Sequence, residues 1–366
     1  MQIKINRDVL LKPLIKVTGI VERRHTLPIL SNLLLEAKNN NIRLTATDLE
    51  MQISLNIATE LKEDLSTTIS AKKILDICRS LPGDADIDLE IKDSRVIVKA
   101  GKSRFNLQTL PAVDYPVMTK EEGKVTKITI SQGEFKGLLK QVEFAMAQQD
   151  IRYYLNGLLL EVKESKLNLV GTDGHRLSFT STTLNQNYEK QDVILPRKTI
   201  IELIKLLEDS REEVTIELAE GQVNFSFGGI SLISKVIDGS FPDYHRVIPK
   251  AHGNTFTVNR VTMLTAMQRA SILSNEKYRG IRMVVNENNL KLISTNTEQE
   301  EAEEELEITY DQEALDIGFN VTYLIDVLNN MQQENINFSF LDANSSCLIT
   351  VPEDDDYKYV VMPMRI

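Results

Sequence analysis

Cysteine and histidine are scarce in this sequence. Its 366 residues include two cysteines and four histidines. Cys78 and Cys347 lie far apart among apolar neighbours, which predicts buried thiols rather than a disulfide or a metal site. No two histidines have the spacing of a metal-binding pair. The sequence therefore predicts no cofactor and no bound metal.

Long apolar runs are also missing. No segment approaches the roughly 20 apolar residues that a membrane-spanning helix needs. The first residues, MQIKINRDVLLKPLIKV, carry charges every few positions and lack the apolar stretch of a signal peptide. We therefore expect a cytoplasmic protein without a membrane partner. Its length predicts two or three domains rather than one core.

One pattern occurs three times along the chain. A pair of strand-like segments ends in Thr47-Asp48, in Thr172-Asp173 and in Thr295-Asn296. Amphipathic segments precede each pair, at residues 7–20, 132–146 and 259–273, and others follow it, at 71–81, 196–207 and 320–331. The repeated unit of about 120 residues predicts three domains, which we place at 1–125, 126–253 and 254–366.

The apolar stripes of these helices predict core contacts, while alternating strands between them are typical of antiparallel sheet. Pro13 predicts a kink or a late start in the first helix. The fold class expected is thus α+β, with two helices packed on antiparallel sheet in each of the three domains. For the second repeat, we expect a strand from Tyr154 to Glu161, a polar turn, and a second strand from Leu167 to Arg176.

The charges are unevenly distributed between the helices and the rest. The six segments carry a net +7, which leaves −18 on the remainder of a chain whose total is −11. In the helices that follow the strand pairs, the centre of the polar face falls at three positions per repeat. These positions are Lys72, Asp76 and Arg79, then Lys198, Glu202 and Lys205, then Thr322, Asp326 and Asn329. Positive charge concentrated on one set of helices of an acidic protein is not what a generic solvated surface predicts.

The cluster Thr172–Leu177 leaves two classes of function open. Asp173 and His175 beside Arg176 would suit a nuclease or hydrolase, but no nucleophile or further ligand lies nearby in the sequence. The other interpretation is a docking surface. A repeat scaffold that binds peptides but never DNA is a further alternative.

Several motifs, in this order and spacing, resemble the bacterial DNA polymerase III beta subunit, the beta sliding clamp. They are LPIL at residues 27–30, ATDLE at 46–50, DIRYYLNG at 150–157, GTDGHRL at 171–177, FPDY at 241–244, ILSNEK at 272–277 and YVVMPMR at 359–365. The resemblance covers the whole chain. It implies a homodimeric ring of six domains that encircles double-stranded DNA and performs no chemistry, so no residue is expected to be catalytic.

The resemblance also implies partners and sites. The expected partners are the DNA polymerase III catalytic subunit, the clamp-loader complex, and other polymerases and repair proteins that carry a clamp-binding peptide. Residues implied in DNA binding are Arg24, Lys72, Gln149, Tyr153 and Tyr154. The implied peptide pocket comprises Leu155, Thr172, Gly174, His175, Arg176, Leu177, Pro242, Val247, Val360, Met362, Pro363, Met364 and Arg365. The implied dimer interface comprises Lys73, Lys102, Arg104, Phe105, Leu107, Ile272, Leu273, Glu298, Glu300, Glu301, Glu303 and Glu304.

Overall fold

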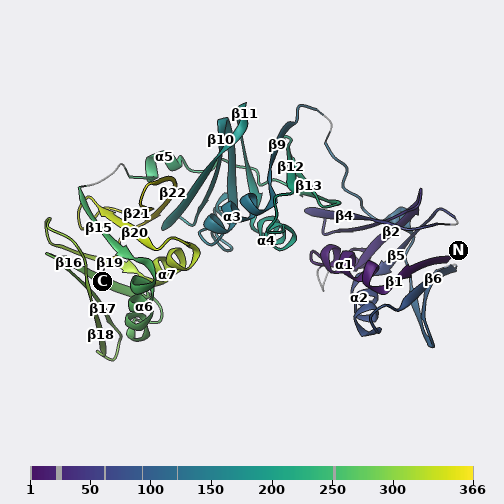
Figure 1. Ribbon diagram of the computed structural model, residues 1–366, viewed down its shortest axis with the longest axis horizontal. Helices are drawn as coiled ribbons and strands as arrows, with labels where there is room; N and C mark the ends of the chain where they lie inside the picture. Colours follow the sequence, from purple (N-terminus) through teal and green to yellow (C-terminus); the bar gives the residue numbers. More distant parts are fainter. Residues whose placement is uncertain are drawn as a thin grey trace. The chain divides into compact units, whose positions relative to one another are not determined.

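The computed structural model describes residues 2–21, 27–61, 63–92, 94–121, 123–249 and 253–365. The chain divides into two compact units (Figure 1). The first comprises Met1–Lys136 with Ile201–Val236, and the second comprises Gly137–Ile200 with Ile237–Ile366. Each unit contains one large sheet and one four-stranded sheet.

Six of the described α-helices begin within one residue of the predicted starts. The α-helices are α1 (Arg7–Thr18), α2 (Ala71–Ser80), α3 (Gln132–Glu143), α4 (Arg197–Leu206), α5 (Tyr244–Val247), α6 (Arg260–Ala270) and α7 (Val321–Asn330). Asn6, Asn259 and Asn320 fix three of these starts, because each side chain accepts a hydrogen bond from a backbone N–H of the first turn. The late start expected from Pro13 is wrong, since α1 begins at Arg7 and continues through the proline.

The large sheet of the first unit has eight strands in the order β5-β2-β3-β4-β14-β13-β12-β9. These strands are β2 (Asn32–Lys38), β3 (Asn41–Thr47), β4 (Met51–Ala58), β5 (Leu65–Ser70), β9 (Thr126–Ser131), β12 (Glu213–Leu218), β13 (Gln222–Phe227) and β14 (Ile230–Lys235). The small sheet is formed by β1 (Gln2–Asn6), β6 (Asp86–Lys92), β7 (Arg95–Ala100) and β8 (Ser103–Gln108), with β8 at one edge.

The large sheet of the second unit has six strands in the order β10-β11-β22-β21-β20-β15. They are β10 (Gly157–Thr172), β11 (Arg176–Pro196), β15 (Asn254–Asn259), β20 (Asn335–Phe340), β21 (Cys347–Val351) and β22 (Asp354–Val361). The small sheet is formed by β16 (Gly280–Asn286), β17 (Asn289–Thr295), β18 (Glu301–Glu307) and β19 (Leu315–Asn320), with β18 at one edge.

The strand of the second repeat starts later than predicted. Tyr153–Asn156 forms a 3-10 turn, so β10 begins at Gly157 rather than Tyr154. The polar turn expected inside this stretch coincides with two register shifts on either side of Glu164, whose φ is 52°. The residues before and after it pair with separate parts of β11. The two predicted strands therefore appear as the two ends of one long element.

Successive repeats are joined by antiparallel pairing inside each large sheet. In the first unit β4 pairs with β14, and in the second unit β11 pairs with β22. The helices bury the predicted apolar stripes; Leu324, Val327 and Leu328 of α7 are fully buried, for example. Both cysteines are buried and free, as expected.

The linker after β8 is tied to the large sheet of the first unit. The Tyr115 hydroxyl donates to the Asn32 carbonyl oxygen and accepts from the Thr47 amide, both at 3.2 Å. Burial raises the pKa of Tyr115 to about 12. Further along, the Gln52 side chain forms two hydrogen bonds with the backbone of Met118, donating to its oxygen at 3.2 Å and accepting from its N–H at 2.8 Å. These contacts hold the linker as an extended segment.

We predict that Tyr115→Phe lowers the free energy of unfolding of the first unit by about 1–3 kcal/mol, because it leaves a buried carbonyl and a buried amide without their partner. Calorimetric unfolding measures this change. Tyr153→Phe serves as the control, since Tyr153 is 57% exposed. An equally stable Tyr115→Phe protein would contradict the importance of these two bonds.

Candidate functional site

The Asp173–His175 cluster is a tight turn between β10 and β11. Asp173 Oδ1 accepts hydrogen bonds from the backbone N–H groups of His175 and Arg176, at 2.9 and 3.0 Å. Thr172 Oγ1 donates to the Arg176 carbonyl oxygen and accepts from the Gly174 N–H. Gly174 has a φ of 89°, in the left-handed region that favours glycine. The aspartate thus stabilises the turn.

The other two repeats contain related turns. In the first, Asp48 Oδ1 accepts from the N–H groups of Glu50 and Met51, and Leu49 has a φ of 76°. In the third, Asn296 Oδ1 accepts from the N–H groups of Glu298 and Glu300. In all three copies an Asp or Asn side chain accepts hydrogen bonds from the backbone of the turn. Its presence in the second copy therefore gives no support for catalysis.

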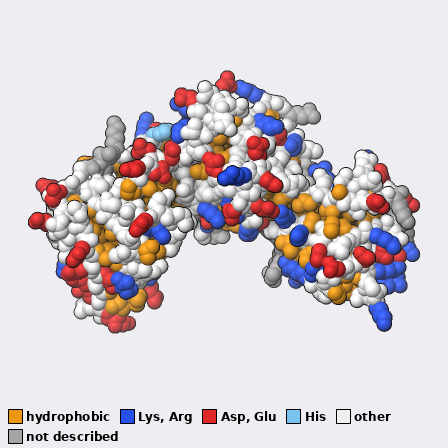
Figure 2. Space-filling view, in the orientation of Figure 1, with side chains coloured by type: hydrophobic (Ala, Val, Ile, Leu, Met, Phe, Trp, Pro, Cys, Tyr) orange, Lys and Arg blue, Asp and Glu red, His pale blue; other side chains and the backbone are white. Residues whose placement is uncertain are grey.

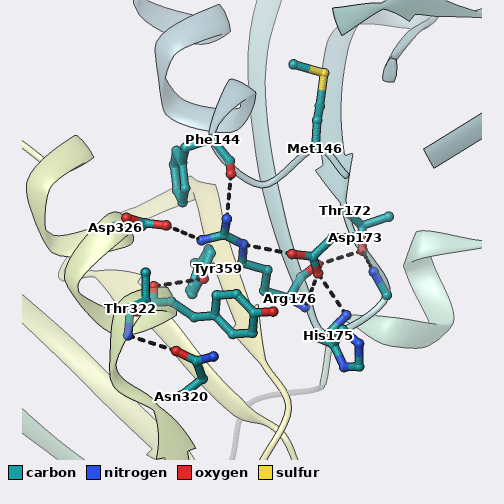
Figure 3. Close-up of polar contacts among 12 residues, drawn as sticks. Phe144, Met146, Thr172, Asp173, His175, Arg176, Asn320, Thr322, Asp326 and Tyr359 are labelled. Carbon is teal, nitrogen blue, oxygen red and sulfur yellow. Dashed lines mark hydrogen bonds and ion pairs between the residues drawn. The ribbon is translucent and has the colours of Figure 1, made fainter. Parts of the chain in front are cut away.

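Arg176 distinguishes the second turn from the others (Figure 3). Its guanidinium donates to Asp173 Oδ2 at 3.1 Å, to Asp326 Oδ2 at 2.6 Å and to the Phe144 carbonyl oxygen at 2.7 Å. The guanidinium also lies 4.5 Å from the centre of the Tyr323 ring. The side chain is only 10% exposed, so these partners compensate for removing a charge from water.

This network joins strand β11, helix α7 and the residue that follows helix α3. Arg176 begins β11, Asp326 lies on α7, and Phe144 directly follows α3. Burial alone lowers the pKa of Arg176, but Tyr359, Asp326 and Asp173 outweigh it and raise the pKa above its ordinary value. Arg176 therefore remains charged and fastens the second repeat to the third.

A cavity of about 220 Å³ opens beside this turn. Its lining is formed by Arg152, Tyr154, Leu155, Thr172, Gly174, His175, Arg176, Leu177, Pro242, Val247, Val360 and Met362. A Cβ at Gly174 would lie 2.9 Å from Arg152 Nη1, so the glycine makes room for this guanidinium. Apolar side chains with a few polar groups around them are typical of a ligand pocket.

Ten of the thirteen residues predicted for a peptide pocket line this cavity. Pro363, Met364 and Arg365 are not among the lining residues. They continue the C-terminal segment, whose Met362 N–H donates to the His175 oxygen and whose Met364 N–H donates to the Gly318 oxygen. Sequence reasoning missed Arg152, whose only signal was its position between Asp150 and the two tyrosines.

The residues predicted to bind DNA lie in different settings. Arg24 falls outside the described residues, and Lys72 is exposed on α2. Gln149 is exposed with a φ of 56° and precedes Tyr153, which is 57% exposed. Tyr154 is half-buried and lines the cavity. The segment that starts at Gln149 thus leads directly into the cavity wall.

Arg152 connects this segment with the turn. It donates to both carboxylate oxygens of Asp150, at 3.0 and 2.9 Å, and to the Asp173 carbonyl oxygen at 3.2 Å. Hydrogen bonds from the Arg152 side chain and backbone lower the pKa of Asp150 to about 2. Asp150 and Asn156 also exchange two hydrogen bonds of 2.9 Å. The segment is therefore closely hydrogen-bonded although it is exposed.

The counterpart of the cavity in the first unit is covered by the linker. In the first repeat Thr47 pairs with Gln52, and in the second repeat Thr172 pairs with Leu177. Gln52 therefore corresponds in position to Leu177, which lines the cavity. Gln52 binds the linker backbone, and the Tyr115 hydroxyl bonds to Thr47. The first junction between repeats, where β4 pairs with β14, is therefore covered by the linker. The second junction, where β11 pairs with β22, has an open cavity instead.

The polar helix faces are less uniformly basic than predicted. Glu202 was expected at the centre of an exposed face of α4, but it is only 6% exposed, and its carboxylate would lie 2.8 Å from a Cβ at Gly19. Asp326, expected on the corresponding face of α7, pairs with Arg176. The prediction failed because these helices contact the preceding repeat through that face. Lys16, Lys136 and Lys205 form ion pairs with Glu208, Asp209 and Glu202.

The residues predicted for a dimer interface lie on the edge strands β8 and β18, in the loops before these strands, on α2 and just after α6. On β8, Arg104 is exposed, Phe105 is half-buried and Leu107 is buried; Lys73 and Lys102 are exposed. Ile272, just after α6, is 76% exposed, and Leu273 is half-buried. In or before β18, Glu298, Glu300, Glu301 and Glu303 are exposed and Glu304 is half-buried. Figure 2 shows acidic side chains gathered over the β17–β18 end of the second unit.

Parts of the acidic edge already have partners within the chain. Glu304 receives two hydrogen bonds from Arg269, and Lys291 pairs with Glu303 and Glu305. Across the described residues, no group of His, Cys, Asp and Glu side chains is suited to hold a metal ion. None of the described helices is long and apolar enough to cross a membrane.

Three repeats, each with two helices packed on antiparallel sheet, define the fold of DNA clamps. Family models of the DNA polymerase III beta subunit match the N-terminal domain at residues 1–119, the central domain at 129–243 and the C-terminal domain at 245–365. The beta sliding clamp of Pseudomonas putida is 45% identical over 368 residues, and that of Escherichia coli is 42% identical over 367, both with full coverage of each chain. The crystal structure of the DNA polymerase III subunit beta from Pseudomonas aeruginosa matches with a TM-score of 0.97 and 45% identity, again over both full chains.

The chain therefore belongs to the DNA polymerase III beta subunit family, the beta sliding clamps. It is a DNA sliding clamp, an accessory subunit of replication rather than an enzyme. The interpretation of Asp173 and His175 as a hydrolytic site is thus wrong.

We predict that Arg176→Met lowers the free energy of unfolding of the second unit by about 3–5 kcal/mol, because it leaves partly buried carboxylates without their cation. Calorimetry measures the shift. Arg282→Met is a matched control, since Arg282 forms a comparable pair with Asp316 on the surface, where ion pairs contribute little. Equal effects of both substitutions would contradict the anchoring role of Arg176.

Proposed function

We propose that two copies of this chain close head to tail into a ring around duplex DNA, and that the cavity beside Arg176 holds peptides of replication and repair proteins. In this proposal the ring has six domains, bounded in each chain at 1–125, 126–253 and 254–366, and works in the cytoplasm. The observation that carries the proposal is the repeated strand pairing between successive domains.

Both junctions within the chain use the same register. Gln52 of β4 pairs with Ile233 of β14, and its counterpart Leu177 of β11 pairs with Val360 of β22. The third repeat has the corresponding strand in β18, where Thr295 pairs with Glu301 as Thr47 pairs with Gln52. β18 is a sheet edge, and such an edge is a template for pairing with another strand.

The first repeat offers the complementary edge, β8. The strand pairs that lead from β1 through β6 and β7 end at Asn106, which lies opposite Ile97 of β7. Asn106 therefore holds the position on β8 that Ile233 holds on β14 and Val360 holds on β22. The shared register then pairs Glu301 with Asn106 of a second copy, Ala302 with Phe105 and Glu303 with Arg104. This opposes the acidic edge to the basic one, which favours the pairing of unlike edges over like ones.

Apolar contacts and further charges support the same interface. Ile272 is 76% exposed beside β18, and burying its side chain on a partner is favourable by the hydrophobic effect. Leu273 and Phe105 are half-buried, and Leu107 completes the apolar part. Lys73 and Lys102 would face Glu298, Glu300 and Glu304. Since two such interfaces close a ring of two chains, the edges of both small sheets become paired.

The proposed DNA contacts are electrostatic and independent of sequence. Exposed Lys72 and Arg79 on α2 support contacts with phosphates. Gln149, Tyr153 and Tyr154 would add contacts at one face, where tyrosine can stack on an unpaired base; Arg24 is included by family resemblance alone. Contacts of this kind are weak, which allows sliding, while the closed ring retains the DNA.

The proposed peptide pocket suits an extended segment with apolar anchors. Leu155, Leu177, Val247 and Val360 give an apolar lining, and Met362 is a flexible side chain that adapts to different ligands. The sliding clamp of Pseudomonas aeruginosa has been crystallised bound to griselimycin. We propose the DNA polymerase III catalytic subunit, the clamp loader and other polymerases and repair proteins as peptide donors for this pocket.

For the dimer, we predict that Arg104→Cys combined with Glu303→Cys forms a disulfide-linked dimer on mild oxidation, visible on a non-reducing gel. Opposed residues of antiparallel strands have neighbouring Cβ atoms. The native thiols should not interfere, because both are buried and burial raises the pKa of Cys78 to about 11. Phe105→Cys with Glu303→Cys is the control, since a shift of one residue points the side chains to opposite faces. Cross-linking of the control alone would overturn the register, and a monomer in sedimentation would overturn the ring.

For the pocket, we predict that Gly174→Ala weakens a synthetic peptide with the C-terminal sequence of a DNA polymerase III catalytic subunit about tenfold, or about 1.4 kcal/mol. The added methyl strains a residue with positive φ and displaces the Arg152 guanidinium. Leu49→Ala is the matched control at the corresponding turn of the first repeat. Fluorescence polarisation measures peptide affinity, and retention on circular DNA should not change. An equal loss from both substitutions would count against this pocket.

A further inference from the structure

Beneath the cavity lies a buried carboxylate that takes no part in its lining. The Glu161 side chain, on β10, is only 7% exposed. Its Oε1 atom accepts hydrogen bonds from the Tyr244 hydroxyl at 2.7 Å and from the Asn168 amide at 3.1 Å, and Lys190 Nζ lies 3.4 Å from Oε2. A buried charge is costly unless such partners surround it. Burial by itself raises the pKa of Glu161, but Tyr244, Asn168 and Lys190 outweigh it and lower the pKa below its ordinary value.

Tyr244 is the first residue of α5, a helix of four residues. An isolated helix of this length is not stable by its own hydrogen bonds. Its position therefore depends on packing contacts. Tyr244 is 3% exposed and stacks on Phe179 with ring centres 5.6 Å apart, and Val247 and Ile248 pack against the same apolar cluster. The Ile248 N–H closes the turn by donating to the Tyr244 carbonyl oxygen at 3.0 Å.

The residues on either side of Tyr244 form one wall of the cavity. Pro242 precedes it and Val247 ends α5, and both line the cavity. Tyr244 itself packs in one apolar cluster with Leu177 and Val360 of the cavity floor. Any displacement of Tyr244 would thus move the wall relative to the floor.

We propose that Glu161 and Tyr244 are a positioning pair that sets the distance between the wall at Pro242–Val247 and the β-sheet floor of the peptide pocket, and so determines how tightly a peptide is held. This inference rests on the proposed peptide-binding function. Stacking on Phe179 is weakly directional, whereas a hydrogen bond to a carboxylate fixes the position of the hydroxyl. Glu161 acts through Tyr244 and touches no ligand.

The test replaces Tyr244 by phenylalanine, which keeps the ring and removes only the hydroxyl. We expect the affinity for the polymerase C-terminal peptide to fall about tenfold, measured by fluorescence polarisation well below the unfolding temperature. Glu161→Gln should retain affinity within about threefold, because the glutamine oxygen can still accept from the Tyr244 hydroxyl. Should Tyr244→Phe fail to fold, Asn168→Ala removes a second donor from Glu161 and is expected to act in the same direction more weakly.

Tyr357→Phe is the matched control. Tyr357 is also 3% exposed, and its hydroxyl accepts from Ser178 and donates to the Gln141 carbonyl oxygen, away from the cavity lining. Peptide affinity should stay within about twofold of the unsubstituted protein in this variant. Equal losses in both tyrosine variants, or no loss in Tyr244→Phe, would overturn the proposal in favour of a merely structural role.

A second readout separates this inference from the proposed function. Hydrogen exchange of the Ile248 amide reports the turn of α5 without any peptide, and it should become at least tenfold faster in Tyr244→Phe but not in Tyr357→Phe. If the unsubstituted protein binds no peptide while this exchange changes, the proposed function fails and the positioning of the wall stands. Unchanged exchange overturns the positioning pair whatever the peptide does.

Discussion

Pairing between the last strand of one repeat and the edge strand of the preceding repeat's sheet is the constraint on which the rest depends. It occurs at β4–β14 and β11–β22 with the same register, so each large sheet belongs to two repeats. The compact units consequently do not coincide with the repeats, and the central repeat is divided between them. Everything placed on such a junction, including the turn at Asp173 and the C-terminal segment, is held by backbone hydrogen bonds from two domains. This explains how the backbone can keep a small pocket in shape.

The two junctions have the same backbone pairing but differ in their side-chain interactions. At one of them Arg176 donates to Asp173, Asp326 and the Phe144 carbonyl oxygen, while at the other Glu202 lies against Gly19. An arginine that satisfies three acceptors gives a directional joint, whereas the Glu202 carboxylate, paired with Lys205, fits the space that a side chain at Gly19 would fill. The same backbone arrangement therefore carries different side-chain interactions at each junction. The Asp–His–Arg cluster, which suggests catalysis when it is considered alone, is a hydrogen-bonded turn whose arginine binds the neighbouring repeat.

Much of the fold was accessible from the sequence because its signals are local and repeated. Asn6, Asn259 and Asn320 cap helices that also carry apolar stripes, so both the starts and the buried faces were predictable. The cavity was accessible only through family resemblance, since Leu155, Leu177 and Val360 come from distant segments. Long-range pairs escaped prediction for the same reason. Glu202 and Asp326 occupy polar helix positions, and nothing local indicates that a neighbouring repeat covers them; Arg152 likewise owes its place to Gly174, 22 positions later.

The linker that covers the first junction has a consequence for how partner proteins bind. Tyr115 and Met118 occupy, within the chain, the place that the second junction leaves open. If proteins of similar peptide chemistry use the open cavity, those arriving on the same chain must displace one another rather than sit side by side. The order in which polymerases and repair proteins act would then be set by competition, through their local concentrations and dissociation rates, without any switch in the clamp itself.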